Sequence, residues 1–459
     1  MTFYVECTHT CHTELNAGIQ RVVRNLVKHS VEARQRPVQP VMFEGNRFVP
    51  APLLLLDPPK AGPDSRSGGA VRRAIKQALR PLIDYGRNVF RTFRLFLAAL
   101  LPFPPLVRFL TAPHTQYGLS GLLKRPLMAL RRKRGSSADL GIAVQPGDVL
   151  VLADASWHLD IWPAIAAFKR QGGLVVWLVY DLIPKTHPQF CENAFVDIFT
   201  QWADRLMTEA DVIIGISRAT AEKVRKALPA SVAERMPPPR ISHFWLGSEL
   251  DGLDPENRKI RPAVQALAGE DEPFYLYVST IEPRKNHGYA LDAFDMLWRR
   301  GIKARMVIAG RVGWRCDALL ERVRRHPCFG ERLQMFNDLT DDELALLYRH
   351  ARGLLFTSFV EGFGLPIVEA LQHGLPVFAS DIPVFHEIGK EGVSFVDLGD
   401  PASLAEAISR HLARGAPRLP APVPWLSWRD SAEQFWQRLE DCLASEPDRR
   451  LQLVNRARA

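Results

Sequence analysis

Two glutamates frame a glycine-containing loop in the second half of the chain. The segment EGFGLPIVE, residues 361–369, follows an apolar run that predicts a buried strand, and Pro366 is suited to the first turn of a helix. A strand that passes through such a loop into a helix exposes backbone N–H groups, which can hold a phosphate. Glu361 and Glu369 can accept hydrogen bonds from sugar or ribose hydroxyls. The loop alone is a weak signal, because Ile367 replaces the third glycine of a dinucleotide fingerprint.

Two adjacent cations follow another predicted strand. Arg284 and Lys285 lie in the segment YVSTIEPRKNH, residues 277–287, where Pro283 stiffens the turn. At the carboxyl end of a strand, neighbouring cations suit a diphosphate. A solvated basic turn is the alternative interpretation. Because both segments fall in one predicted domain, together they favour a nucleoside diphosphate site more strongly than either does alone.

Strands and helices that alternate along the chain must hold these residues in place. Apolar runs predict strands at 2–5, 40–43, 149–153, 174–180, 212–216 and 240–244, and at 274–279, 305–309, 333–336, 353–357, 376–379 and 393–396. Amphipathic stretches between the runs predict helices, so the sheets should be parallel and covered on both faces. The fold class is therefore α/β, with two doubly wound domains whose ligand binds at the carboxyl ends of the strands, in the cleft between the domains.

The domain boundaries follow changes in composition. Residues 1–250 form the predicted N-terminal domain, and an insertion at about 58–140 interrupts its alternation. Residues 251–273 are rich in charges and lack a strong period, which predicts a linker. Residues 274–424 form the C-terminal domain. Residues 425–459 contain a helix with Trp428 and Trp436 at core positions, expected to pack back on the N-terminal domain.

The insertion holds most of the positive charge. The chain carries a formal net charge of +9, yet residues 66–134 contain 15 Lys or Arg and one acid, Asp84. Apolar side chains accompany these cations, which favours contact with an anionic membrane surface over the alternative of a solvated helical insertion. Nucleic acid is not an expected partner, because no recognised binding motif is present.

Cysteine usage and hydropathy limit the class of protein. Six cysteines among 459 residues are too few for a disulfide framework. Cys7, His9, Cys11 and His12 lie close together, but their spacing matches no common zinc template. The start of the chain lacks a basic region, so no signal peptide is expected. The longest apolar run, 95–107, is too short to span a bilayer, which takes about 20 residues.

Taken together, the motifs resemble the GT4 family of retaining glycosyltransferases. EGFGLPIVEA is similar to its paired-glutamate element and STIEPRKNH to its diphosphate element, while IAGRVGW (308–314) and SDIPVFHEIG (380–389) also resemble it. LNAGIQRVVRNL (15–26) and VYDLIPKTHPQF (179–190) are less specific. The resemblance is strongest to bacterial mannosyltransferase-like enzymes of O-antigen and surface polysaccharide assembly. It covers the two core domains and implies the GT-B fold, with two Rossmann-like domains facing a central cleft.

The resemblance also implies roles for individual residues. The catalytic set would be Arg284 and Lys285, which neutralise the leaving diphosphate, Glu361, which contacts the transferred sugar, and Asp181, which lines the reaction centre. The donor would also be held by Glu369 at the ribose, by backbone groups, and by the N-terminal loop; the residues concerned are Phe363, Gly364, Leu365, Asn16 and Gly18. The family often has His directly before the acid at 181, where this chain has Tyr180, so His158 or His187 is a candidate substitute.

The predicted function is retaining transfer of a sugar, with mannose from GDP-mannose favoured, to a lipid-linked or growing polysaccharide acceptor. The resemblance implies no metal and no cofactor beyond the nucleotide sugar, and the chain contains no Asp-x-Asp pair. We expect a peripheral protein at the cytoplasmic face of the cell membrane, held there by residues 66–134. The alternatives are a sugar-nucleotide epimerase of similar fold and a non-catalytic membrane-associated scaffold.

Overall fold

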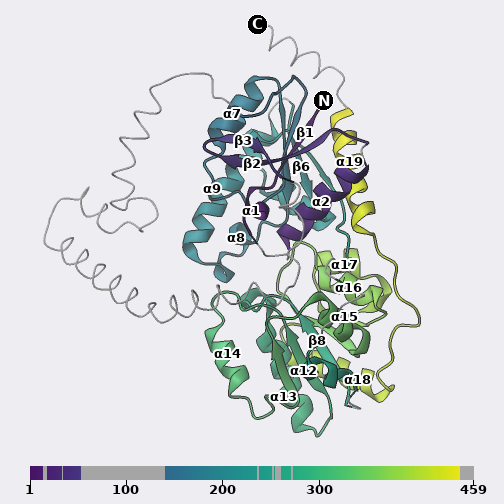
Figure 1. Cartoon of the computed structure of the whole chain (residues 1–459). Helices are drawn as coiled ribbons and strands as arrows, with labels where there is room; N and C mark the ends of the chain where they lie inside the picture. Colours follow the sequence, from purple (N-terminus) through teal and green to yellow (C-terminus); the bar gives the residue numbers. More distant parts are fainter. Residues whose placement is uncertain are drawn as a thin grey trace, which may run out of the picture. The chain divides into compact units, whose positions relative to one another are not determined.

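The computed structural model describes residues 1–13, 18–33, 35–52, 140–234, 237–250, 253, 260–269 and 272–444. These residues belong to one compact unit. They form two sheets of mostly parallel strands flanked by helices (Figure 1). The predicted α/β class and its two doubly wound domains are therefore confirmed. The basic insertion, Asn16 and the segment from residue 445 onward lie outside the described residues.

The N-terminal sheet has the strand order β3-β2-β1-β4-β5-β6-β7. Its strands are β1 (Phe3–Glu6), β2 (Val38–Glu44), β3 (Arg47–Pro50), β4 (Val149–Leu152), β5 (Leu174–Val179), β6 (Val212–Gly215) and β7 (Arg240–His243). All neighbouring pairs are parallel except β2 and β3. Every residue of β1, β4 and β6 is buried, which explains why these strands are apolar except for Glu6 at the end of β1.

Strand β3 is the one addition to the strands expected in this half. It forms an antiparallel hairpin with β2 through a two-residue turn, Gly45-Asn46, and Glu44 pairs with Arg47 across it. Both turn residues have positive φ, +57° and +67°, as the favoured hairpin turn requires. The glycine–asparagine pair was the available sequence signal for this edge strand.

The helices of the N-terminal domain alternate with its strands. They are α1 (Thr8–Cys11), α2 (Ile19–Ala33), α7 (Trp162–Arg170), α8 (Ile183–Thr186), α9 (Asn193–Glu209), α10 (Arg218–Ala227) and α11 (Ala230–Ala233). Helix α10 begins at a capping serine, because Ser217 Oγ accepts a hydrogen bond from the Thr220 N–H at 3.0 Å. This cap fixes the helix end that faces the C-terminal domain.

The C-terminal sheet is parallel, with the order β10-β9-β8-β11-β12-β13. Its strands are β8 (Phe274–Val278), β9 (Arg305–Ala309), β10 (Leu333–Phe336), β11 (Gly353–Phe356), β12 (Val377–Ser380) and β13 (Val393–Val396). Its helices are α12 (Pro262–Gly269), α13 (His287–Arg299), α14 (Asp317–Arg324), α15 (Asp341–His350), α16 (Leu365–Gln372), α17 (Pro383–Gly389) and α18 (Pro401–Ala413). Helix α12 lies inside the predicted linker and packs on α15.

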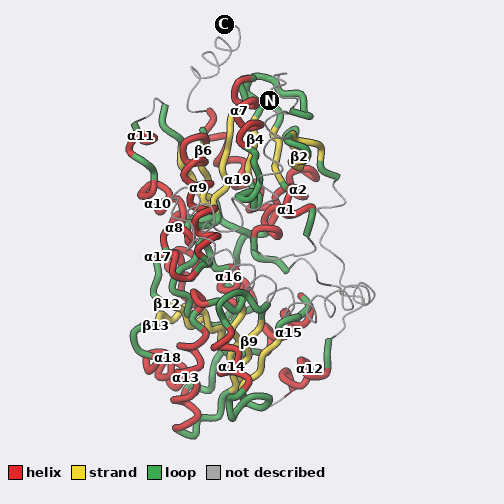
Figure 2. The backbone as a smooth tube through the Cα atoms, turned by 90° about the vertical axis from the view of Figure 1, so that its left-hand side faces the viewer, coloured by secondary structure: helices red, strands yellow, loops and turns green. Residues whose placement is uncertain are grey.

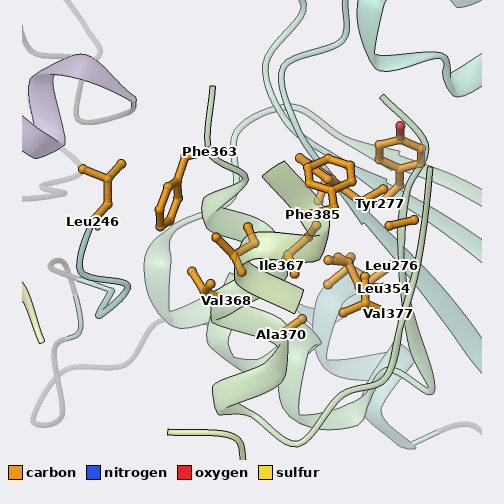
Figure 3. Packing of buried hydrophobic residues seen from close by; sticks show 14 of the residues in the cluster. Leu246, Leu276, Tyr277, Leu354, Phe363, Ile367, Val368, Ala370, Val377 and Phe385 are labelled. Atoms are coloured by element: carbon orange, nitrogen blue, oxygen red, sulfur yellow. The ribbon is translucent and has the colours of Figure 1, made fainter. Parts of the chain in front are cut away.

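Helix α16 anchors the glycine-containing loop in the core of the C-terminal domain. Phe363 precedes the helix, while Ile367, Val368 and Ala370 lie along it, and all four are buried. Figure 3 shows Ile367 on the side of the helix that faces the strands near Leu354, and Val368 on the side toward Phe363. The loop is therefore held rigidly from its helical side.

The last described helix packs on the N-terminal domain. Helix α19 (Trp428–Ala444) packs on α2 and β7, and both views place it beside the N-terminal sheet (Figures 1 and 2). The rings of Trp436 and Phe3 are 4.9 Å apart, and Trp436 Nε1 donates to Ser30 Oγ at 2.6 Å. Trp428 and Trp436 are 3% and 1% exposed, which confirms their predicted place in the core.

Candidate active site at the domain interface

The cationic turn lies at the carboxyl end of β8. After the strand, Pro283–Lys285 form a short 3-10 helix that ends at Asn286, whose φ of +58° turns the chain into α13. The Phe359 N–H donates to the Arg284 carbonyl oxygen at 2.8 Å. This bond ties the cationic turn to the segment that follows β11, so the two sequence motifs meet at one edge of the sheet.

Glu361 joins both cations in one buried cluster. Arg284 Nη1 lies 2.8 Å from Glu361 Oε2, and Lys285 Nζ pairs with Glu361 Oε1. Arg284 Nε also lies 2.7 Å from Glu282 Oε1. Burial alone would raise the pKa of Glu361, but Arg284 and Lys285 lower it to about 2. Glu361 therefore stays ionised at neutral pH and holds both cations in position.

The other groups of this cluster respond to burial in different ways. Burial raises the pKa of Glu282, although Arg284 and Lys285 oppose that rise. Burial and the charge of Arg284 lower the pKa of Lys285. Arg284 lies next to several acids, which raise its pKa despite burial. The guanidinium is thus a permanent charge, whereas the pKa of Lys285 is lowered despite the opposing effect of Glu361 and Glu282.

Glu369 lies about one turn into α16 from the glycine-containing loop and is buried. Its Oε2 accepts from the Tyr348 hydroxyl at 2.7 Å, and its Oε1 accepts from Arg21 Nη1 at 2.6 Å. Arg21 belongs to α2 of the N-terminal domain, and its guanidinium also lies over the ring of Trp428. The carboxylate expected at the ribose is therefore held by an ion pair between the two domains.

The loop around Gly362 packs tightly against the N-terminal domain. A Cβ atom at Gly362 would lie 2.0 Å from the Tyr180 carbonyl oxygen, so only glycine allows this approach. The Gly362 carbonyl oxygen accepts from Ser217 Oγ at 2.7 Å and from Thr220 Oγ1 at 3.0 Å. Next to them, Lys223 Nζ donates to the Glu361 carbonyl oxygen at 3.1 Å. Helix α10 thus brings a third cation to the site.

A second contact fixes α10 against the C-terminal domain. Glu387, from the predicted motif 380–389, accepts from the N–H groups of Arg218 and Ala219 at 2.7 and 2.9 Å. A carboxylate at a helix N-terminus satisfies free N–H groups and complements the helix dipole. Trp245 Nε1 donates to the same carboxylate at 2.6 Å. In the structure, this motif therefore joins the C-terminal domain to α10 of the N-terminal domain.

Of the N-terminal candidates, Asp181 lies beside Arg284 at the site. Asp181 is half-buried, and its Oδ1 accepts from the Ile183 N–H at 2.8 Å. Burial raises the pKa of Asp181, and Arg284 opposes that rise. The Tyr180 hydroxyl donates to the Ala153 carbonyl oxygen at 2.6 Å. Gly18, with φ of +53°, starts α2.

The two histidine candidates have partners of their own. His187 Nδ1 lies 2.8 Å from Thr186 Oγ1, and the ring stacks on Phe190. His158 lies 6.0 Å from the ring of His9, and burial together with His9 lowers the pKa of His158. Both rings therefore favour the neutral form near pH 7.

The sequence interpretation named the central cluster but overlooked two N-terminal cations. Arg284, Lys285 and Glu361 were predicted and are in direct contact. Arg21 and Lys223 were not singled out, although both stand on helices that follow strands of the N-terminal sheet. Arg21 lies in the predicted motif 15–26, three residues after Gly18, and this spacing was the signal available. For Lys223 the sequence offers no comparable signal.

Within the described residues, no group of three or more His, Cys, Asp or Glu is arranged to hold a metal ion. Cys7 and Cys11, the cysteines of the N-terminal cluster, have sulfur atoms 3.7 Å apart, and His12 Nδ1 bonds to the Thr8 carbonyl oxygen. Among the helices that the structure describes, none has the length and apolar character needed to cross a bilayer.

Comparison with known proteins gives relatives for both halves. Residues 261–419 match the family model of the Glycosyl transferases group 1. The serotype-specific mannosyltransferase WbdA of Escherichia coli is 34% identical over 308 residues, which cover 64% of this chain and 37% of WbdA. The O-antigen chain mannosyltransferase B of Escherichia coli is 32% identical over 178 residues, covering 38% of this chain and 45% of that relative. The chain thus spans less than half the length of these curated relatives.

Solved structures share the two-domain arrangement. Sucrose-phosphate synthase from Thermosynechococcus elongatus has a TM-score of 0.55 at 18% identity, with 97% of this chain and 100% of that chain covered. HepE from Anabaena, solved with UDP and glucose, has a TM-score of 0.52 at 14% identity, with the same coverage. At these identities the likeness shows the fold alone, and that fold is GT-B.

Proposed function

We propose that the chain is a glycosyltransferase that uses a nucleoside diphosphate sugar, because residues 261–419 match the family model of the Glycosyl transferases group 1. The observation that carries the proposal is the buried cluster of Arg284, Lys285 and Glu361 at the carboxyl edge of the C-terminal sheet. A guanidinium and an ammonium fixed side by side match the two phosphates of such a donor.

The cluster suits charge stabilisation at the leaving group. When the bond between the anomeric carbon and the diphosphate breaks, negative charge develops on the departing oxygens and positive charge on the sugar ring. Arg284 and Lys285 would stabilise the diphosphate, and the permanently ionised Glu361 would stabilise the ring. Fixed charges in a site sheltered from water need little reorganisation during the reaction, which is how positioning alone can accelerate transfer.

The N-terminal domain completes the proposed site from the other side. Lys223 contacts the loop at Glu361, and Asp181 lies at the end of β5 beside Arg284. Because these groups reach the donor site only when the domains are together, catalysis would depend on domain closure. Glu369 would exchange its bond to Arg21 for a bond to the ribose hydroxyls.

The finer assignment rests on the relatives. Because WbdA and the O-antigen enzyme are described as mannosyltransferases, we propose mannose from GDP-mannose as the transferred group. We further propose retention of the anomeric configuration, no metal requirement, and a lipid-linked or growing polysaccharide as acceptor. The basic residues 66–134 would hold the enzyme at an anionic membrane surface. Replacing Arg131, Arg132, Lys133 and Arg134 with Ser should then weaken binding to anionic vesicles.

A thermal-shift screen tests the donor site. GDP, UDP, dTDP and ADP, each alone and with its sugars, would be added to the wild-type chain, because a ligand that binds only the folded state raises the Tm. We expect one nucleotide to raise the Tm of the wild type and to have little effect on Lys285→Ala. Lys303→Ala is the matched control, since Lys303 is exposed in the same domain. Failure of every nucleotide to shift the wild type would refute the donor site.

Turnover distinguishes a transferase from the other candidates. A transferase releases nucleoside diphosphate only as its sugar reaches an acceptor, whereas an epimerase converts the donor without acceptor. A scaffold does neither. Product analysis with and without a membrane fraction that supplies acceptor therefore separates the three functions.

A further inference from the structure

The hydroxyl group of Tyr277 links the cationic turn to the strand beside it. Tyr277 belongs to β8 and is fully buried. Its hydroxyl donates to the Lys285 carbonyl oxygen and accepts from the Thr357 N–H at 3.1 Å. Thr357 directly follows β11, which pairs with β8. One oxygen atom therefore bridges the carboxyl ends of two neighbouring strands.

The carbonyl groups on either side of Lys285 are also bonded to the segment after β11. The Phe359 N–H donates to the Arg284 carbonyl oxygen at 2.8 Å, and Thr357 Oγ1 donates to the Asn286 carbonyl oxygen at 3.3 Å. Three consecutive carbonyl groups of the turn therefore have partners, which fixes its main chain. Of these three bonds, the central one comes from the strand that leads into the turn.

The bridge joins the main-chain segments that carry the two partners of an ion pair. The Lys285 ammonium lies 5.0 Å from the centroid of the Phe356 ring and pairs with the carboxylate of Glu361. Thr357 begins the segment that leads to Glu361, four residues further along the chain. A shift of either segment would change how the ammonium and the carboxylate meet, and the bridge opposes such a shift.

A neighbour on α13 sets the orientation of the Tyr277 ring. The His287 ring stacks on it at a centroid distance of 4.3 Å and an interplanar angle of 27°, and His287 Nε2 lies 3.1 Å from Ser279 Oγ. Burial raises the pKa of Tyr277, whereas burial and the charge of Lys285 lower the pKa of His287 to about 3. At neutral pH the hydroxyl is therefore protonated and can donate, and the ring stacked on it is uncharged.

We propose that the Tyr277 hydroxyl positions the Lys285 ammonium for the diphosphate of the donor. The inference rests on the proposed function and adds a positioning residue to the same site. Tyr277 acts through the main chain of Lys285 and Thr357 and needs no contact with the substrate. Contacts between a cation and a phosphate depend on geometry, so an ammonium carried by a loosened turn should lose part of its affinity for the diphosphate.

Equilibrium binding of GDP and GMP to the full chain tests this role. GDP has one phosphate more than GMP, so the ratio of their Kd values, measured by calorimetric titration, reports how well the cations hold a diphosphate. We expect the wild type to prefer GDP by about tenfold or more, and Tyr277→Phe to lose most of this preference. If the thermal screen selects another base, the diphosphate and monophosphate of that base replace this pair.

A matched control removes the other buried hydroxyl of the same strand. Tyr275 also belongs to β8 and is equally buried, but its hydroxyl lies 2.8 Å from His411 Nδ1 of α18. Tyr275→Phe should therefore keep the wild-type preference for GDP. The two variants make the same chemical change, so a difference between them belongs to the bonds of the Tyr277 hydroxyl.

Two further variants separate positioning from folding. Adding Tyr277→Phe to Lys285→Ala should leave the ratio of that single variant unchanged, because the hydroxyl acts through Lys285. Thr357→Val removes the hydroxyl that donates to the Asn286 carbonyl oxygen, so it should lower the preference by about twofold. It provides a second test of the held turn if Tyr277→Phe does not fold.

The outcomes distinguish this inference from the proposed function. A folded Tyr277→Phe chain that keeps the wild-type ratio would overturn the inference alone, as would one that weakens GDP and GMP equally or one whose effect persists in the Lys285→Ala chain. If that variant does not fold, a wild-type ratio in Thr357→Val would overturn it. A wild type without any preference for GDP over GMP would contradict the proposed function and this inference together.

Discussion

Replacing Gly362 with alanine should block the approach of the two domains. The added Cβ would lie 2.0 Å from the Tyr180 carbonyl oxygen, whereas ordinary contacts begin near 3.4 Å, so the loop or the strand end must retreat by about 1.4 Å. The same retreat would lengthen the bonds from Ser217 and Thr220 to the Gly362 carbonyl oxygen. A displacement of about 1 Å at a reaction centre can cost roughly 100-fold in rate. We therefore expect kcat/KM to fall about 100-fold, equivalent to about 2.7 kcal/mol of transition-state stabilisation.

Steady-state transfer kinetics, with circular dichroism as a check on folding, would measure this effect. Gly288→Ala is the matched control, because a Cβ at Gly288 meets nothing within 4 Å in the same domain. It should leave kcat/KM near the wild-type value. A Gly362→Ala enzyme with kcat/KM within threefold of the wild type would refute the inference that catalysis requires this contact.

Three further perturbations test other contacts of the site. Lys223→Met should lower kcat by about 10- to 100-fold, since it removes the cation that α10 brings to the site, while Lys226→Met, exposed on the same helix, should not change kcat. Arg21→Met should lower the Tm of the nucleotide-free enzyme by roughly 10 °C, because the buried carboxylate of Glu369 loses its cation, and Arg21→Met with Glu369→Gln should recover part of that loss in a thermal melt. The pKa of Glu361 is lowered from its usual 4.5 to about 2, so its contribution to stability is complete above about pH 4.5 and disappears as the pH falls toward 2. Urea unfolding at pH 3 and pH 6 should therefore show a larger loss of stability for the wild type than for Glu361→Gln, and equal losses would contradict the ion cluster.

The strands were predictable because each is a local pattern. Buried parallel strands are apolar throughout, so runs such as 149–153 and 353–357 mark them directly. Strand β3 was not predicted because it is a short edge strand whose end residues, Arg47 and Pro50, are exposed. Helix α12 was not predicted, because its eight residues are too few to give a clear apolar period and charged residues flank them on both sides.

The residues of the site that come from a single domain could be predicted from the sequence. Arg284, Lys285 and Glu361 all follow neighbouring strands of the same sheet, so the topology that predicts the sheet also brings them together. Arg21 could not be assigned in this way. Its ion pair with Glu369 depends on how the two domains pack, and a local pattern of residues does not encode that packing.

The central claim is that Arg284, Lys285 and Glu361 hold a nucleoside diphosphate sugar during transfer. Transfer of labelled sugar from the donor that the thermal screen identifies to a membrane-derived acceptor tests it most directly, with Lys285→Ala and Glu361→Ala beside the wild type and Lys303→Ala as control. We predict that both site variants remain folded and lose transfer at least 100-fold, while the control transfers normally. Transfer at the wild-type rate by either site variant would contradict the account.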